Sequence, residues 1–300
     1  MRLSTSQIFQ QAVTTMQNKQ AELARTQLQL AKGEKLLAPS DDPSSSTRIL
    51  DLNNVIETTT QYQRNADYAK TRLSLEETVL TNVGDVLQRT RELSVRANNA
   101  TLSAGDRKAI AIEVRANIEA LVELGNSRDV NGEYLFSGFK TGTVPFVDNG
   151  GGNFTYEGDQ GQRNLQIGAT RQVADGDTGD DIFMKIDDGA GGLGSMFSVL
   201  YDFAQDLEAN NPSTTTITRL DSAIDAVLNT RSSIGARMNA IENQKNANDS
   251  FSLLLQENRS ELEDLDYAEA VSRFQQQMLA LQASQQTFVK IEGLSLFNYL

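Results

Sequence analysis

The 300-residue chain contains no histidine, no cysteine and no tryptophan, and the first two absences remove whole classes of chemistry. Without histidine the chain cannot carry a Ser-His-Asp triad, an imidazole base or the usual zinc-peptidase ligands. Without cysteine it has no disulfide and no thiolate nucleophile, which fits both the cytosol and an exported protein. Only carboxylate, lysine, tyrosine or hydroxyl chemistry remains, and we expect no metal and no cofactor.

Basic residues and long apolar runs are also scarce. The chain has 27 Lys and Arg against 40 Asp and Glu, a formal net charge of -13. Nucleic-acid phosphates need clustered basic side chains, so we exclude nucleic acid as a partner. No apolar run approaches the length of a membrane span, and residues 1–7 lack the apolar region of a signal peptide. We therefore expect neither a membrane span nor a cleaved signal.

Apolar residues recur at heptad spacing at both ends of the chain. This period is typical of a narrow apolar stripe on a helix that pairs with another helix. An ordinary amphipathic helix of a globular domain is the alternative for either stripe alone. The simplest way for two such helices to bury their apolar stripes is to pack on each other and then on copies of the chain. The predicted assembly-interface residues are Phe9, Met16, Leu23, Leu30, Val271, Phe274, Met278, Leu281 and Phe288.

Proline and capping signals divide the first half of the chain. The first helix is predicted to end at about Leu37, before Pro39, and Asp42 with Pro43 indicates a helix restart. A long helix over 47–98 follows, with Leu73, Leu80 and Leu87 on its apolar stripe. We interpret its charged side, Arg64, Asp67, Lys70, Arg72, Glu76 and Glu77, as a solvated face. A capping pattern at 103–106 opens a shorter helix that ends near residue 125.

The second half contains one long heptad frame. A helix is predicted over 195–209, followed by a break at 210–212. The frame then runs from Leu220 until its phase is lost at 264–267, which marks a junction before the C-terminal helix. Its in-phase residues are Leu220, Val227, Ile234, Ile241, Leu255 and Leu262, with Asn248 as the polar exception.

Residues 140–194 differ from the rest by holding most of the 21 glycines and many aspartates. Short alternating runs between glycine turns predict a β-rich insert, outermost and separable from the helical layer. Residues 189–194 match a dinucleotide fingerprint, but no second strand follows and the flanking acids would repel a pyrophosphate. Residues 175–181 fit no EF-hand frame, and we interpret them as an acidic solvated loop.

The predicted fold class is mainly α with a small β-rich inserted domain and a long helical hairpin or coiled coil formed by the N- and C-terminal segments. Three layers are expected. Residues 1–43 plus 265–300 form a terminal helical coiled coil, the inner assembly layer. Residues 44–139 plus 195–264 form a helical bundle, and residues 140–194 form the outer insert.

Four stretches of the chain, in order, resemble the flagellin superfamily of bacterial flagellar axial proteins. The resemblance covers residues 1–138 and 219–300. Within the superfamily it is greatest for members at the hook-filament junction, because of the small insert, the 132–138 stretch and the ending 295–300. The matching stretches are Pro39–Pro43, Arg91–Arg96 with Ser103–Arg107, Gly132–Gly138 and Leu265–Ala268.

This resemblance implies a non-enzymatic structural adaptor that assembles through its terminal helices into a homo-oligomeric ring. Its implied partners are hook-associated protein 1 below, flagellin above and a flagellar export chaperone. It also implies export through the flagellar type III apparatus and an extracellular place in the flagellum. One alternative is a short flagellin of the filament. Another is a ligand-binding or enzymatic module in the insert, for which the sequence offers no positive support.

Overall fold

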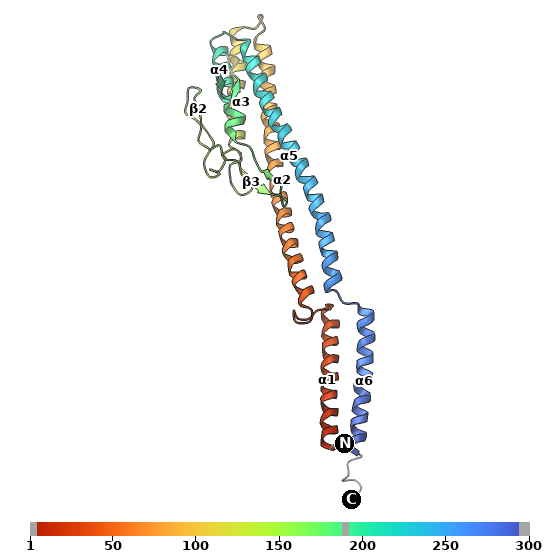
Figure 1. The fold of residues 1–300 in the computed structure, drawn as a ribbon. Coiled ribbons are helices and arrows are strands. Elements are labelled where there is room, and N and C mark those ends of the chain that lie inside the picture. The colour runs from red at the N-terminus through yellow and green to blue at the C-terminus, as the bar shows by residue number, and fades with distance from the viewer. Residues whose placement is uncertain (1–4, 188–191, 294–300) are drawn as a thin grey trace. The chain divides into compact units, whose positions relative to one another are not determined.

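A computed structural model of the chain describes residues 5–187 and 192–293 and is mainly helical, as predicted (Figure 1). The chain forms two compact units, residues 1–58 with 250–300 and residues 59–249. Residues 189–191 of the glycine motif and the ending 295–300 lie outside the described residues. Within the described ranges, no helix combines the length and the apolarity that crossing a membrane requires. The helices are α1 (Thr5–Lys32), α2 (Pro43–Ala97), α3 (Ala104–Gly125), α4 (Met196–Glu208), α5 (Thr215–Glu263) and α6 (Tyr267–Gly293).

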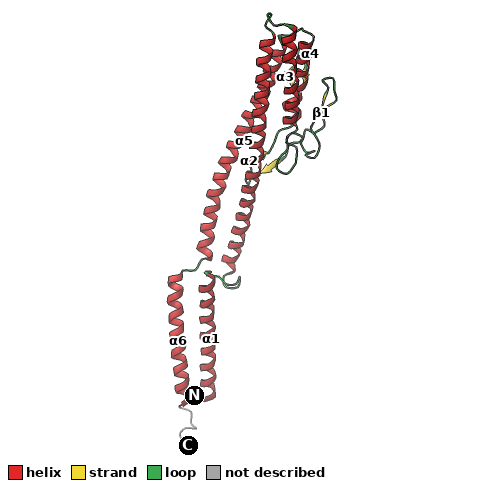
Figure 2. Cartoon of the chain, turned by 180° about the vertical axis from the view of Figure 1, so that it is seen from behind, coloured by secondary structure: helices red, strands yellow, loops and turns green. Residues whose placement is uncertain are grey.

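The first unit contains α1 and α6, which lie side by side in both ribbon views (Figures 1 and 2). Helix α1 ends at Lys32, five residues before the predicted end at Leu37. The reason is Gly33, which adopts a φ of 76° and donates its N–H to the carbonyl of Gln29 at 2.8 Å. A glycine in the left-handed region just after the last turn is a common way to end a helix.

The predicted helix restart at Pro43 is confirmed. Helix α2 begins at this residue, where the missing N–H of proline costs no hydrogen bond. The carboxylate of Asp42 accepts the backbone N–H groups of Ser44 and Ser45, both at 3.1 Å. These contacts satisfy two of the free donors at the helix start.

The second unit is built on α2 and α5, with α3 and α4 packed beside them. The apolar stripes predicted for both long helices are buried: Leu73, Leu80, Leu87, Leu220, Val227, Ile234 and Ile241. The capping box of α3 is also confirmed, since Ser103 Oγ accepts the N–H of Asp106 at 3.2 Å and the Asp106 carboxylate accepts the N–H of Ser103 at 3.1 Å. Helix α4 begins after Ser195, close to the predicted position.

The described residues of the insert, 140–187 and 192–194, contain six short strands and one turn of π-helix, η1 (Asp180–Met184). The strands pair as three separate antiparallel hairpins, with Phe146 opposite Tyr156, Asn164 opposite Ala174, and Ile186 opposite Gly194. Because each strand has two or three residues, the insert is strand-containing but mostly loop. The strands are β1 (Phe146–Asp148), β2 (Phe154–Tyr156), β3 (Asn164–Gln166), β4 (Gln172–Ala174), β5 (Ile186–Asp187) and β6 (Leu193–Gly194).

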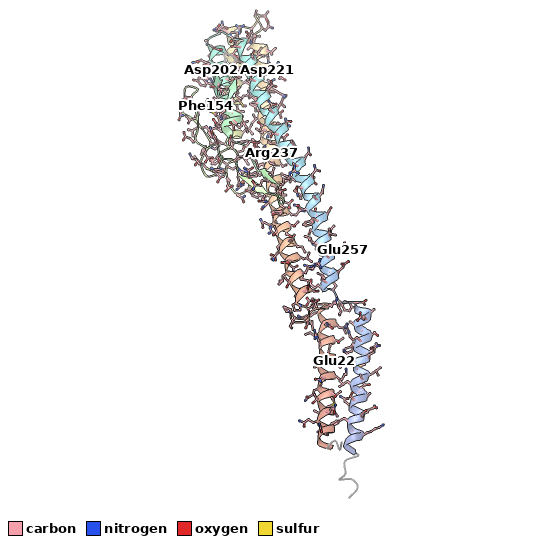
Figure 3. The ribbon with its side chains drawn as sticks, viewed as in Figure 1. Glu22, Phe154, Asp202, Asp221, Arg237 and Glu257 are labelled. Carbon is pink, nitrogen blue, oxygen red and sulfur yellow. The ribbon has the colours of Figure 1, made fainter. Side chains whose placement is uncertain are left out.

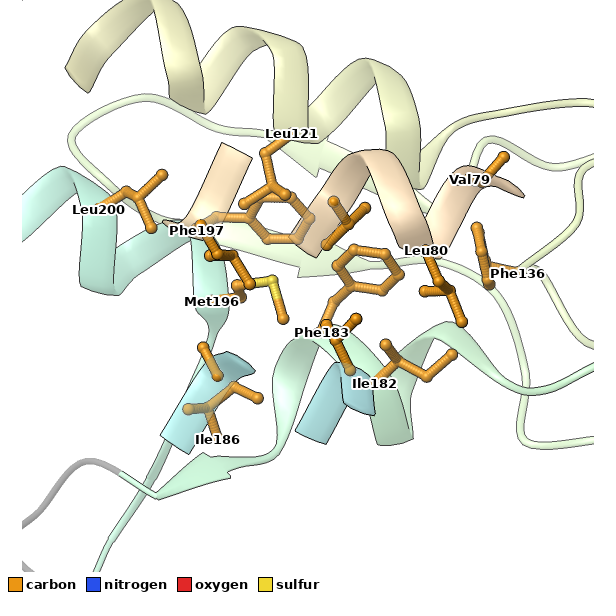
Figure 4. Packing of buried hydrophobic residues seen from close by; sticks show 14 of the residues in the cluster. Val79, Leu80, Leu121, Phe136, Ile182, Phe183, Ile186, Met196, Phe197 and Leu200 are labelled. Atoms are coloured by element: carbon orange, nitrogen blue, oxygen red, sulfur yellow. The ribbon is translucent and has the colours of Figure 1, made fainter. Parts of the chain in front are cut away.

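The insert shares one hydrophobic core with the helices, as Figure 4 shows. Phe183 of η1 lies against Phe197 of α4, with near-parallel rings whose centroids are 5.7 Å apart. Phe146 of β1 contacts both rings, at 5.0 Å and 5.1 Å. Leu121 of α3 and Leu80 of α2 belong to the same cluster. This packing contradicts the expectation that the insert is separable from the helical layer.

We predict that Phe183→Ala lowers the free energy of unfolding of the second unit by about 3–5 kcal/mol, because it leaves a cavity in a fully buried aromatic cluster. Phe139→Ala is the matched control, since this phenylalanine next to the insert is 64% exposed and should change stability by less than about 0.5 kcal/mol. Denaturant unfolding followed by circular dichroism measures both. Equal losses for the two variants would show that the insert aromatics do not support the core.

Candidate assembly surface

The two loops at the ends of α1 and α5 are joined by backbone hydrogen bonds. Glu34 and Asp264 form an isolated antiparallel bridge. Lys35 donates its N–H to the Glu263 carbonyl at 2.7 Å, and Leu265 donates to the carbonyl of the glycine that ends α1, at 2.9 Å. This bridge fixes which residue of α1 lies level with which residue of α6.

The register of the terminal helices follows from that bridge. Both helices rise by about 1.5 Å per residue, so antiparallel residues at equal distances from the bridge lie at the same level. Phe9 and Phe288 lie at such a level, and their ring centroids are 5.0 Å apart. Moving seven residues along each helix from this pair, toward the bridge, gives two further pairs of residues that lie level with each other. The pairs at one level are Phe9–Phe288, Met16–Leu281 and Leu23–Phe274.

None of the nine predicted interface residues is buried in the single chain. Six are half-buried, whereas Phe9, Val271 and Met278 are 44%, 43% and 40% exposed. Leu279 and Val289, which the sequence reasoning did not select, are more exposed still. The structure therefore brings Phe9 and Phe288 into contact but leaves the stripe on α6 partly uncovered.

The pair of terminal helices buries little apolar surface by itself. The buried hydrophobic residues of the first unit are Leu255, Leu265 and Ala270, whereas all other buried hydrophobic residues of the described chain lie in the second unit. Along α6, Arg273 Nε and Gln277 Oε1 are buried but find no hydrogen-bond partner among the described residues. An unpaired buried polar atom costs about 1–3 kcal/mol. The isolated helix pair is therefore weakly stabilised.

A second group of exposed apolar residues in the first unit was missed by the sequence reasoning. It lies where α2 begins and α5 ends, close to the loop bridge in sequence. The one available signal is the apolar run 253–255, because three consecutive helical residues cannot all face one partner. The exposed members are Leu50, Val55, Phe251, Leu253 and Leu254.

The charged face predicted for α2 is only partly solvated, which corrects the sequence interpretation. Arg72 is 7% exposed and pairs with Asp129 at 3.2 Å, while Glu76 is 1% exposed. The insert covers these side chains, and its Asp175 is 2% exposed beside Arg163. The predicted acidic solvated loop is therefore anchored at this point by buried charge pairs.

A cleft of about 220 Å³ lies next to this cluster and is lined by residues of the insert and of α2. Its charged lining is largely paired: Arg163 Nε donates to Asp175 at 2.8 Å, and Arg72 pairs with Asp129. In the described part of the chain, acidic side chains form no group of three that could hold a metal ion.

Comparisons with known proteins agree with this architecture. The chain matches the bacterial flagellin N-terminal helical region over residues 3–141 and the bacterial flagellin C-terminal helical region over residues 217–300. Flagellar hook-associated protein 3 of Escherichia coli K12 is 32% identical over 318 residues, which covers 99% of each chain. Phase 1 flagellin of Salmonella naestved is 27% identical over 45% of this chain and 27% of its own.

Among solved structures, flagellar hook-associated protein 3 of Legionella pneumophila has a similar fold. Its TM-score is 0.66 at 22% identity, covering 71% of this chain and 98% of that chain. Paired terminal helices joined to a helical unit with a small insert define a flagellin-type protein. The chain belongs to the family of flagellar hook-associated protein 3.

The absence of cysteine allows a direct test of the helix register. We predict that Met16→Cys combined with Leu281→Cys forms an intramolecular disulfide on mild oxidation, because these positions lie at one level and disulfides require close Cα atoms. Met16→Cys with Leu279→Cys is the control, since residue 279 is 63% exposed and lies outside the heptad stripe. Electrophoretic mobility without reductant measures the bond. Equal crosslinking of both pairs would mean that the register is not fixed.

Proposed function

We propose that this protein is a structural adaptor of the bacterial flagellum that joins hook to filament by self-assembly through its terminal helices. The observation that carries the proposal is the partly exposed apolar seam of α1 and α6, which two helices leave incomplete. Neighbouring copies would cover Val271, Met278 and Leu279 and so complete the core. The full-length likeness to flagellar hook-associated protein 3 supports the same role.

The proposed assembly is a homo-oligomeric ring within the flagellum, working with hook and filament components. Hook-associated protein 1 lies below this ring and flagellin lies above it. A dedicated export chaperone and passage through the flagellar type III apparatus complete the proposal. The lack of cysteine supports this route, because no disulfide has to be broken before transit.

The layered organisation of the chain is also proposed. Residues 1–43 and 265–300 form the inner layer, residues 44–139 and 195–264 the middle layer, and residues 140–194 the outer insert. The helix breaks at residues 33–42 and 264–266 support two of these boundaries. We assign no catalytic role, because the cleft beside the insert is lined by charges that are largely paired with one another.

The filament-subunit alternative is the weaker one. Flagellin of Salmonella naestved shares similarity over less than half of this chain, whereas the hook-associated relative matches almost all of it, insert included. A filament subunit would be the bulk material of the filament. A junction protein would be needed only in a few copies, and its loss would release unpolymerised flagellin.

We predict that Phe274→Asp combined with Leu281→Asp abolishes incorporation at the hook tip. A carboxylate placed in a seam that becomes buried on assembly costs several kcal/mol, more than the roughly 1.5–3 kcal/mol that burial of each side chain contributes. Purified protein is added from outside to hooks that lack it, so that export does not affect the result, and flagellin polymerisation is then measured.

Phe139→Asp with Leu193→Asp is the matched control, since both side chains are largely exposed and the residue types are the same. This control should support polymerisation like the parent protein. The melting transition of the second unit should stay near the parent value in both double variants. If the seam variant still supports flagellin polymerisation, the seam is not an assembly interface.

A further inference from the structure

One segment of the insert, residues 174–177, is held on two sides by the long helices of the second unit. Glu76 of α2 accepts the backbone N–H of Asp177 through Oε1 at 3.2 Å. Arg237 of α5, labelled in Figure 3, forms an ion pair with the Asp177 carboxylate. Arg237 also donates to the carbonyls of Ala174 at 3.4 Å and Gly176 at 3.5 Å. These contacts join three elements that are far apart in sequence.

Glu76 is the one titratable member of this contact that is completely enclosed. Burial raises its pKa well above the ordinary 4.5, and the nearby Asp177 carboxylate raises it further. Arg237 on α5, the hydrogen bond from the Asp177 N–H and Arg72 on the same helix lower the pKa, but each arginine already pairs with another carboxylate, Asp177 and Asp129 respectively, and the net pKa stays well above 4.5. Glu76 is therefore held as a neutral acid beyond the pH at which an exposed glutamate ionises.

We propose that residues 174–177 form a pH-operated latch on α2, which neutral Glu76 holds closed and which opens when Glu76 releases its proton to solvent. Ionisation would leave a buried carboxylate close to a second carboxylate, and movement of the segment away from α2 lets water reach it. The Arg237 contacts bind the segment to α5, and Arg72 of α2 pairs with its Asp175 at 3.9 Å, so the opening is local to the Glu76 contact. This inference does not rest on the assembly function.

The direction of the pH dependence follows from linkage. A group whose pKa is raised by folding contributes stability that is fully present at pH values below the pKa that the group has in the unfolded chain. That stability is lost as the pH rises toward the folded-state pKa. The latch is therefore closed in acid and loosens as the pH is raised above the ordinary glutamate range.

Hydrogen–deuterium exchange on the full chain tests the latch, with rates corrected for the intrinsic effect of pH. Peptides that cover residues 174–177 should lose protection as the pH rises. Peptides from the buried core of α2, residues 79–87, should keep theirs over the same range. Simultaneous loss in both segments, or loss in neither, would overturn the proposal.

Glu76→Gln keeps a carbonyl acceptor for the Asp177 N–H but cannot ionise, so its protection at 174–177 should no longer depend on pH. Glu77→Gln is the matched control, because this neighbouring glutamate is more exposed and pairs with Arg231 at 2.8 Å. It should retain the wild-type pH dependence. If Glu76→Gln loses protection over the same pH range as the wild type, Glu76 is not the trigger.

Infrared spectroscopy on the wild-type protein covers the case in which Glu76→Gln does not fold. The protein should show the carbonyl band of a protonated carboxylic acid, which disappears over the same pH range as the protection of residues 174–177. Absence of this band above the range in which ordinary carboxyl groups titrate would overturn the proposal.

Discussion

Two helices cannot cover a heptad stripe of this composition on all sides. In α1 and α6 large apolar residues recur every seven positions, from Phe9 to Leu30 and from Phe274 to Phe288, while Leu28, Met278 and Leu279 between them remain exposed. The pair is held in register by the loop bridge of Glu34 and Asp264, but it encloses almost no apolar core. Further helices are needed to complete it.

The second unit, in contrast, buries its apolar stripes within one chain. Its long helices bury their stripes against α3, α4 and the aromatic residues of the insert. The buried charge pair of Arg72 with Asp175 then fixes the insert on α2. The protein thus combines a self-sufficient unit with a terminal helix pair whose stability depends on its neighbours.

Much of this organisation could be predicted from local patterns. The heptad phases, the Pro43 restart and the capping box at Ser103 depend on residues close in sequence, and the structure confirms them. Helix α1 ends before the predicted position because Gly33, and not Pro39, terminates it. The burial of Glu76 could not be predicted, because the segment that covers it lies about 100 residues further along the chain. A distant contact also explains why Asn248 stands among the apolar heptad residues of α5. Its Nδ2 donates to the carbonyl of Ile167 in the insert at 2.9 Å.

Limited proteolysis of the free monomer and of the protein assembled on hooks tests whether neighbouring copies complete the terminal core. We expect protease to trim α1 and α6 from the free monomer, whereas residues 73–93 of α2 should resist because they lie in a closed core. Once the protein is assembled, the same terminal helices should resist digestion. A free monomer whose α1 survives as long as residues 73–93 would contradict the claim that neighbouring copies complete the terminal core.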